Sequence, residues 1–247
     1  MFRLDPPKSN DGDWTEEILW NFSGSPSDGY GPVGPLVIGN DGAIYGVTKY
    51  GGSGEYGTVF ELTPSAAGGN WKENILYNFG TAFGDSYPTG VILGPNHVLY
   101  GTTLQPDGKA CDDVGTFPCG ILFELRRPDA PGGAWTEATL ITFTVDSSID
   151  GVQPYAPPIL GPDGVLYGTT GSGGADGYGT IFKLLPPSSP GGEWTEVVLY
   201  SFTDAVDGWL PTGIAFGPDG NIYGTTTLIL EKGGVGNYGT VFQFMLQ

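Results

Sequence analysis

Four copies of one sequence unit follow each other along the chain, and this repetition constrains the fold more than any other feature. Each copy is about 60 residues long and carries three motifs in a fixed order. The first reads Trp-x-Glu, with a Phe eight residues after the Trp, and begins at Trp14, Trp71, Trp135 and Trp194. The second reads Ile/Leu-Tyr-Gly and begins at Ile44, Leu99, Leu166 and Ile222. The third is an apolar pair ending in Phe, at Val59-Phe60, Leu122-Phe123, Ile181-Phe182 and Val241-Phe242, and Met1–Leu4 resembles a fifth copy of it.

Each unit also contains a short apolar run that ends in a turn, as at Gly161-Pro162-Asp163-Gly164. Proline presets φ for the second turn position and glycine accepts the left-handed conformation, so these turns predict hairpins. No segment shows a helical period, and the apolar runs are too short for helices. Four strands joined as a meander and repeated in tandem are typical of propeller blades. A parallel β-helix is the main alternative, but it favours shorter coils without these tight turns.

The sequence therefore predicts an all-β, four-bladed β-propeller that forms one domain over residues 1–247. The repeats span approximately 1–58, 59–120, 121–180 and 181–240, with a closing strand at 241–247. We expect the Ile/Leu-Gly run to be innermost, the Tyr-Gly strand second, the Phe strand third and the Trp-Glu strand outermost. Two ring closures stay open: Trp14–Phe22 completes the last blade, or two chains exchange ends and form a homodimer.

The motif Asp163-Gly164-Val165-Leu166-Tyr167-Gly168-Thr169-Thr170, followed by Tyr178-Gly179-Thr180-Ile181-Phe182-Lys183-Leu184, resembles the Gloeo/Verruco (GloVer) tandem repeat of bacterial secreted and surface proteins. All four units match it, and the second is the most divergent, with Asn96-His97 where Asp-Gly is usual. The resemblance implies an exported scaffold built from repeats. It implies no agreed activity.

The amino-acid composition limits which binding partners and which cellular location the chain is expected to have. The formal net charge is −18, from 27 acidic and 9 basic residues, which disfavours nucleic acid and anionic membrane surfaces. No apolar run is long enough to span a bilayer, so no membrane insertion is expected. Cys111 and Cys119 are the only cysteines, and their spacing fits neither a zinc site nor a redox motif. A disulfide between them is predicted, which indicates an extracellular or cell-surface location.

An aspartate stands just before the innermost strand in every unit, at Asp28, Asp85, Asp150 and Asp207. Aromatic side chains accompany these carboxylates: Tyr30, Tyr87, Tyr155 and Trp209. Carboxylates that accept sugar hydroxyls, beside rings that stack on sugars, predict a site for a glycan or another polar small molecule. A ring of Asp could instead hold Ca²⁺, although no other cofactor is expected. The structural alternative is that each Asp caps its own turn.

His97 is the only histidine and falls in a hairpin turn, so chemistry based on a histidine general base is disfavoured. Two of the four aspartates acting as acid and base or nucleophile, as in a glycoside hydrolase, form the enzyme alternative. The leading hypothesis is a secreted or surface binding module that recognises carbohydrate at the loop face. A purely structural repeat segment of a larger surface protein is the third alternative.

Overall fold

The fold was analysed in a computed structural model of the chain. The structure describes residues 1–9, 12–65, 70–80, 86–104, 119–130, 132–144, 150–189, 191–203, 207–227 and 238–246. Among these residues the regular structure is almost entirely strand, and the one helical element is a 3-10 turn, η1, at Pro95–His97. This turn contains the divergent Asn96-His97 pair, which places His97 in a hairpin turn as predicted.

Three complete blades are four-stranded antiparallel meanders, and a fourth blade has three described strands. Blade 1 contains β3 (Gly29–Ile38), β4 (Ile44–Gly51), β5 (Thr58–Thr63) and β6 (Lys72–Asn78). Blade 2 contains β7 (Pro88–Leu93), β8 (Leu99–Thr103), β9 (Ile121–Arg126) and β10 (Thr136–Thr142). Blade 3 contains β12 (Ile159–Leu160), β13 (Leu166–Thr170), β15 (Thr180–Leu185) and β16 (Thr195–Ser201). Blade 4 contains β17 (Trp209–Phe216), β18 (Ile222–Thr227) and β19 (Thr240–Phe244).

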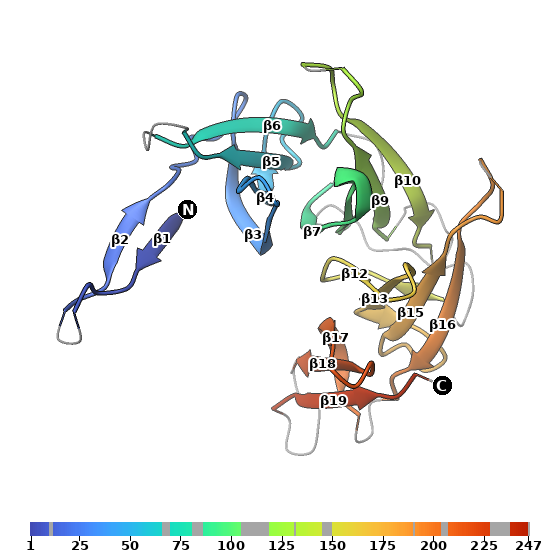
Figure 1. The fold of residues 1–247 in the computed structure, drawn as a ribbon. Helices are drawn as coiled ribbons and strands as arrows, with labels where there is room; N and C mark the ends of the chain where they lie inside the picture. Colours follow the sequence, from blue (N-terminus) through green and yellow to red (C-terminus); the bar gives the residue numbers. More distant parts are fainter. Residues whose placement is uncertain are drawn as a thin grey trace.

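The order of strands within each blade confirms the sequence assignment from innermost to outermost, and the blades follow one another around an arc (Figure 1). A small pair, β11 (Gly151–Val152) with β14 (Ser172–Gly173), extends the start of blade 3. The four-bladed propeller arrangement predicted from the repeats is therefore present.

The predicted closure of the ring by Trp14–Phe22 is not what the structure shows. β1 (Phe2–Asp5) pairs with β2 (Thr15–Ile18) in a separate two-stranded sheet, with Phe2 opposite Ile18. β2 therefore does not pair with β19, and the two sheets lie at opposite ends of an open arc (Figure 1). The physical reason is that β1 and β19 are both third strands, so each can use the same edge of β2.

The core lies between the blades. One cluster joins blades 1 and 2 and includes Val59, Val91 and Phe123, all fully buried. A second cluster joins blades 2 and 3 and includes Leu122, Phe143 and Phe182. Each third strand thus sends alternate side chains into the two neighbouring junctions, because successive residues of a strand point to opposite faces.

Threonine hydroxyls pair inside the blades where the second strand meets the third. Thr48 lies 2.8 Å from Thr58, and Thr170 lies 2.8 Å from Thr180, oxygen to oxygen. All four threonines are fully buried, so each hydroxyl needs a partner there. A third pair, Thr226 with Thr240 at 2.7 Å, occurs in blade 4. In these three blades the pairs give a structural role to the Thr that stands two residues after Tyr-Gly.

Candidate functional site

The loops lie at two opposite ends of the blades. Gly29 pairs with Gly51, and Thr58 with Asn78, so the blade-to-blade connections and the loops between second and third strands share one end. The hairpin turns between first and second strands lie at the other end, because Ile38 pairs with Ile44 there. The end that carries the Gly-rich loops is called the loop face below.

The aspartates on this face hold their own loops together. Asp28 is buried, and its carboxylate accepts hydrogen bonds from the Ser23 amide, the Ser23 hydroxyl and the Gly29 amide at 2.6, 3.1 and 2.6 Å. Asp207 accepts hydrogen bonds from Tyr200 and from the amide and hydroxyl of Thr203, at 2.8 to 2.9 Å. Both carboxylates therefore serve the turn-capping role that was the structural alternative.

Burial works against ionisation of Asp207, but the hydrogen bonds from Tyr200 and Thr203 outweigh it and hold the pKa of Asp207 below its usual value. Burial of the Tyr200 ring and its hydrogen bond to Asp207 raise the pKa of Tyr200 to about 12. A carboxylate stabilised in this way is a poor general acid near neutral pH. Asp85 lies outside the described residues.

Two of the loop aspartates, Asp28 and Asp150, also influence the pKa of a glutamate in the outermost strand of the same blade. Burial raises the pKa of Glu73 to about 8, and the charge and hydrogen bonding of Asp28 add to this rise. Burial also raises the pKa of Glu196 to about 7, with the charge of Asp150 as the second cause. Both glutamates are the acidic residues of the Trp-x-Glu motif in blades 1 and 3.

Two of the four predicted aromatic residues, Tyr30 and Tyr87, come together on the loop face with two tyrosines that were not among the predicted site residues. Tyr30 stacks on Tyr50 with ring centroids 5.3 Å apart and an interplanar angle of 24°. Tyr50 meets Tyr87 edge-on at 5.5 Å, and Tyr87 meets Tyr56 at 5.9 Å. The Lys49 ammonium lies 5.3 Å from the Tyr50 ring centroid and 5.7 Å from that of Tyr87. This set of four tyrosines and one lysine is called the tyrosine cluster.

Local sequence explains why these rings meet. Gly31 has φ of +66°, and a Cβ at this position would lie 3.3 Å from the Tyr50 ring, so glycine allows the ring to pack closely. Tyr87 has φ of +56° and precedes Pro88, which turns its ring toward Tyr50 from the next blade. The Tyr30 side chain stays 47% exposed, so the stack presents a ring to solvent.

The other predicted aromatic residues lie at the junction of blades 3 and 4. Trp209 meets Tyr178 edge-on at 5.7 Å, and the Trp209 indole nitrogen is buried without a hydrogen-bond partner among the described residues. Tyr155 is 38% exposed and lies against Gly171 and Leu210. The structure therefore divides the predicted aromatic set between two separate blade junctions.

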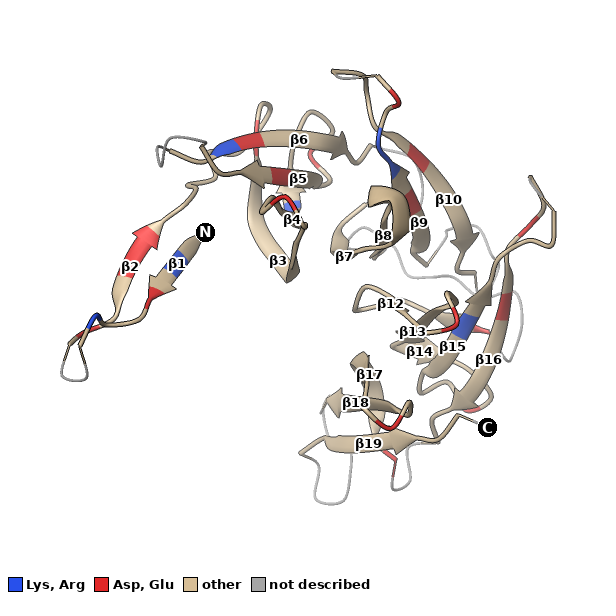
Figure 2. Ribbon diagram, viewed as in Figure 1, with Lys and Arg blue, Asp and Glu red and all other residues tan. Residues whose placement is uncertain are grey.

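Two members of the tyrosine cluster, Tyr50 and Lys49, are not explained by the repeat, whereas Tyr56 recurs as Tyr178 and Tyr238. Tyr50 lies near the end of β4, at a position where the other units have Gln105, Ser172 and Leu228. Lys49 corresponds to Leu104, Gly171 and Thr227. The only sequence signal for this part of the cluster was an aromatic residue, Tyr50, directly after Lys49 at the end of the second strand. Basic residues are few among the described strands, and Lys49 in β4 is one of them (Figure 2).

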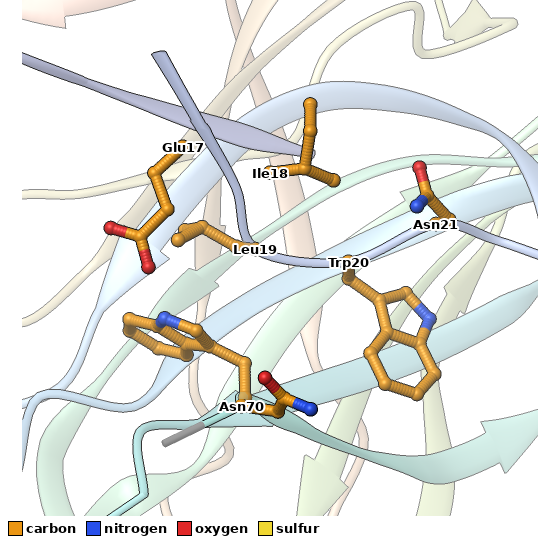
Figure 3. Close-up of a pocket in the computed structure, with 7 residues that line it drawn as sticks. Glu17, Ile18, Leu19, Trp20, Asn21 and Asn70 are labelled. Atoms are coloured by element: carbon orange, nitrogen blue, oxygen red, sulfur yellow. The ribbon is translucent and has the colours of Figure 1, made fainter. Parts of the chain in front are cut away.

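A different aromatic cleft lies at the outer edge of the arc. Trp20 and Trp71 line a space of about 390 Å³ with Glu17, Asn21 and Asn70 (Figure 3). An equivalent cleft lies between Leu76 and Trp135 at the next junction. Because this cleft recurs at successive junctions, the Trp of the Trp-x-Glu motif is explained by the packing of one outermost strand beside the next blade.

No three Cys, His, Asp or Glu side chains gather as a metal site within the described part of the chain, so these residues give the Ca²⁺ alternative no support. Cys119 is buried at the start of the third strand of blade 2, whereas Cys111 lies outside the described residues. The disulfide stays a prediction. Among the described residues no helix is long and apolar enough to cross a membrane.

Comparison with known families decides the affiliation of the chain. The family model of the Gloeobacter/Verrucomicrobia repeat matches residues 109–247, which is more than half of the sequence. The chain belongs to this repeat family. No curated protein matches the sequence.

Solved structures with the same fold include the PQQ-bound aldose sugar dehydrogenase of Streptomyces coelicolor, with a TM-score of 0.52 and 15% identity. The alignment covers 84% of this chain and 59% of the dehydrogenase, so the chain spans about three fifths of that protein. A putative gluconolactonase has a TM-score of 0.51 and 14% identity, with 97% and 69% coverage. Trypanosoma rangeli sialidase has a TM-score of 0.49 and 13% identity. At these identities the likeness shows the propeller fold.

Proposed function

We propose that this repeat protein is a secreted or cell-surface binding module that recognises carbohydrate through the tyrosine cluster. The observation that carries the proposal is the exposed stack of Tyr30 on Tyr50, with Tyr87 and the Lys49 ammonium beside it. Aromatic faces offer large contact areas to the C–H faces of sugar rings, and polar groups at their edges fix orientation. The structural neighbours named for a sugar dehydrogenase and a gluconolactonase are consistent with such a ligand class.

Two of the described aspartates support the choice of binding over catalysis in this proposal. These two, Asp28 and Asp207, are engaged by hydrogen bonds from their own loops. The carboxyl pairs that do occur, Glu73 with Asp28 and Glu196 with Asp150, lie within single blades and are partly or fully buried. The enzyme alternative can therefore use a glutamate–aspartate pair as well as two of the four aspartates.

The test is retention of the protein on a panel of polysaccharides: xylan, β-glucan, alginate and pectin, with released sugars assayed in each supernatant. We expect retention without sugar release, and Tyr50→Ala should weaken binding at least tenfold because it removes the central ring. Lys49→Ala should weaken binding to the uronate polymers alginate and pectin more than to the neutral ones. Tyr155→Ala, a similarly exposed tyrosine at another junction, is the matched control.

Equal retention of the wild type and Tyr50→Ala would contradict this site. Sugar release that disappears in Glu73→Gln, with retention unchanged, would instead establish the enzyme alternative at the Glu73–Asp28 pair.

A further inference from the structure

The three junctions between neighbouring blades, 1 with 2, 2 with 3 and 3 with 4, share one set of contacts, and the two ends of the arc each carry half of that set. The forward surface of a blade is defined here as the side that meets the following blade, and the back surface as the side that meets the preceding one. No described strand covers the forward surface of blade 4, and among the described elements only the β1–β2 sheet lies near the back surface of blade 1 (Figure 1).

The first shared contact is a backbone hydrogen bond. The carbonyls of Tyr56, Cys119 and Tyr178 accept it from the following blade. The donors are the amides of Tyr87, Gln153 and Leu210, at 2.9, 3.1 and 3.4 Å. Each donor has a positive φ and stands directly before a proline. In blade 4 the residue equivalent to these acceptors is Tyr238, which is 88% exposed. In blade 1 the residue equivalent to the donors is Gly31, with φ of +66° before Pro32.

The second shared contact is apolar. Val59, Leu122 and Ile181 occupy equivalent positions of the third strand, face the following blade and are at most 1% exposed. Their equivalent in blade 4 is Val241, which is 81% exposed. On the receiving side, Val91 of blade 2 is fully buried. Its equivalent in blade 1 is Leu36, which is 49% exposed.

The third shared contact links the second strand of one blade to the end of the first strand of the next. The Tyr167 ring meets the Phe216 ring edge-on, with centroids 5.3 Å apart. The residue equivalent to Tyr167 in blade 4 is Tyr223, which is 36% exposed. The residue equivalent to Phe216 in blade 1 is Ile38, which is 70% exposed. The forward surface of blade 4 thus displays the same residue types that are buried at the internal junctions.

The strands at the two ends of the arc are complementary in the same way. β19 pairs with β18, and its outer edge carries no partner among the described strands, whereas each complete blade has a fourth strand there. β2 carries the Trp-x-Glu motif of a fourth strand, and the following Phe22 packs on Phe60 at 5.1 Å as Phe79 packs on Phe123. β2 therefore already stands in the position of the fourth strand that precedes blade 1.

We propose that two copies of this chain join tail to head, with the forward surface of blade 4 of one copy against the back surface of blade 1 of the other. Val241 then packs on Leu36 of the second copy, Tyr223 meets Ile38, and the Tyr238 carbonyl accepts the Gly31 amide. In the second copy, β2 gives up its pairing with β1 and pairs with β19 of the first copy. The register of this new pairing places Ile18 opposite Phe242. Val241, Leu36, Tyr223 and Ile38 are uncharged, so no like charges meet in these apolar contacts.

Two identical junctions close the pair, because the second copy offers the same tail to the head of the first. Closure within one chain would need the same surfaces, but they lie at opposite ends of the arc (Figure 1). A second copy supplies the further blades that a closed ring requires.

The test measures the mass of the full chain by sedimentation velocity and light scattering. The expected mass is twice 25.9 kDa. Val241→Asp and Leu36→Asp each place a charge in both junctions, so each variant alone should be monomeric. A mixture of the two variants restores one unaltered junction, because the tail of one and the head of the other are intact, and dimer should reappear. Tyr155→Asp, remote from both surfaces, should stay dimeric.

A monomeric wild type would overturn the proposal. Dimers that survive both charged variants, or a mixture that stays monomeric, would overturn the tail-to-head arrangement. The strand assignment has its own readout: Arg3→Pro weakens only the β1–β2 pairing and should raise the dimer fraction, whereas Glu17→Pro breaks β2 and should lower it. The opposite ranking of these two variants would overturn the role of β2.

Discussion

The phenyl ring of Phe143 meets that of Phe182 edge-on, with centroids 5.6 Å apart and an interplanar angle of 64°, and this contact joins the outermost strand of blade 2 to the third strand of blade 3. The same contact occurs at every blade junction: Phe22 with Phe60, Phe79 with Phe123, and Phe202 with Phe242, at 5.1 to 5.4 Å. The phenylalanine eight residues after each tryptophan is therefore a link between blades rather than part of its own blade's core.

Removal of this link should be costly. Phe143→Ala leaves a cavity between two blades and should lower the free energy of unfolding by about 3–5 kcal/mol, because the ring is only 2% exposed. Phe2→Ala, at a 58% exposed position, is the control and should change stability by less than about 0.5 kcal/mol. Chemical denaturation followed by intrinsic fluorescence measures both. A small effect of Phe143→Ala would mean that the junction relaxes around the gap.

The glycine of the Tyr-Gly motif makes this packing fit. A Cβ on Gly168 would lie 2.5 Å from Cζ of Phe182. In each of the other blades the equivalent glycine faces the equivalent phenylalanine ring of its own blade. Gly168→Ala should therefore destabilise the protein by about 1–3 kcal/mol through overpacking. Gly80→Ala, where no atom lies within 4 Å, should be nearly neutral. Equal denaturation midpoints for the two variants would contradict this role of the motif glycine.

The buried glutamates predict an unusual pH dependence. Glu73 has a folded pKa of about 8 and Glu196 of about 7, both above the ordinary value of 4.5. Between the ordinary pKa of 4.5 and the folded values, the folded state therefore binds more protons than the unfolded state. The free energy of unfolding then falls as pH rises from about 5 to 8. Because Glu73 is only half-buried, solvent screening reduces the effect, and we expect a loss of a few degrees in Tm rather than full conversion of the pKa shift.

Glu73→Gln should flatten this pH dependence, since the amide stays neutral throughout the range. Glu193→Gln, at an exposed loop position, should leave the slope as it is in the wild type. Thermal unfolding by circular dichroism at a series of pH values compares the three proteins. A wild-type Tm that rises from pH 5 to pH 8 would show that these glutamates ionise freely in the fold.

The residue before the proline of each innermost strand is held in the left-handed region. Gln153 has φ of +62° there, and its amide donates the hydrogen bond to Cys119 in the preceding blade. A non-glycine residue costs about 1–2 kcal/mol in this conformation, so Gln153→Gly should be more stable than Gln153→Ala by about 1 kcal/mol. The alanine variant controls for the side-chain contact with Ser172. Equal stabilities would show that the strain is relieved elsewhere.

The sequence by itself determined the architecture, because repetition, tight turns and alternating apolar positions leave few folds that bury every motif at once. The order of strands, the loop face and the turn at His97 all follow from it. The mutual placement of the aromatic side chains was not determined in this way. Tyr50 and Lys49 came into the candidate site only through β3–β4 pairing and the position of the next blade, which are long-range contacts without a local signal.

Tertiary structure also decided between roles that the sequence left equal. The sequence around each Asp is compatible with a carboxylate that faces a ligand and with one that caps its own loop. Only the hydrogen bonds of Asp28 and Asp207 show that these two carboxylates cap their own loops. Ring closure was ambiguous for a similar reason: β1 and β19 are equivalent third strands, and local propensity cannot choose which of them pairs with β2. That choice depends on how far the arc curves, a property of the packing between blades that accumulates over the whole chain.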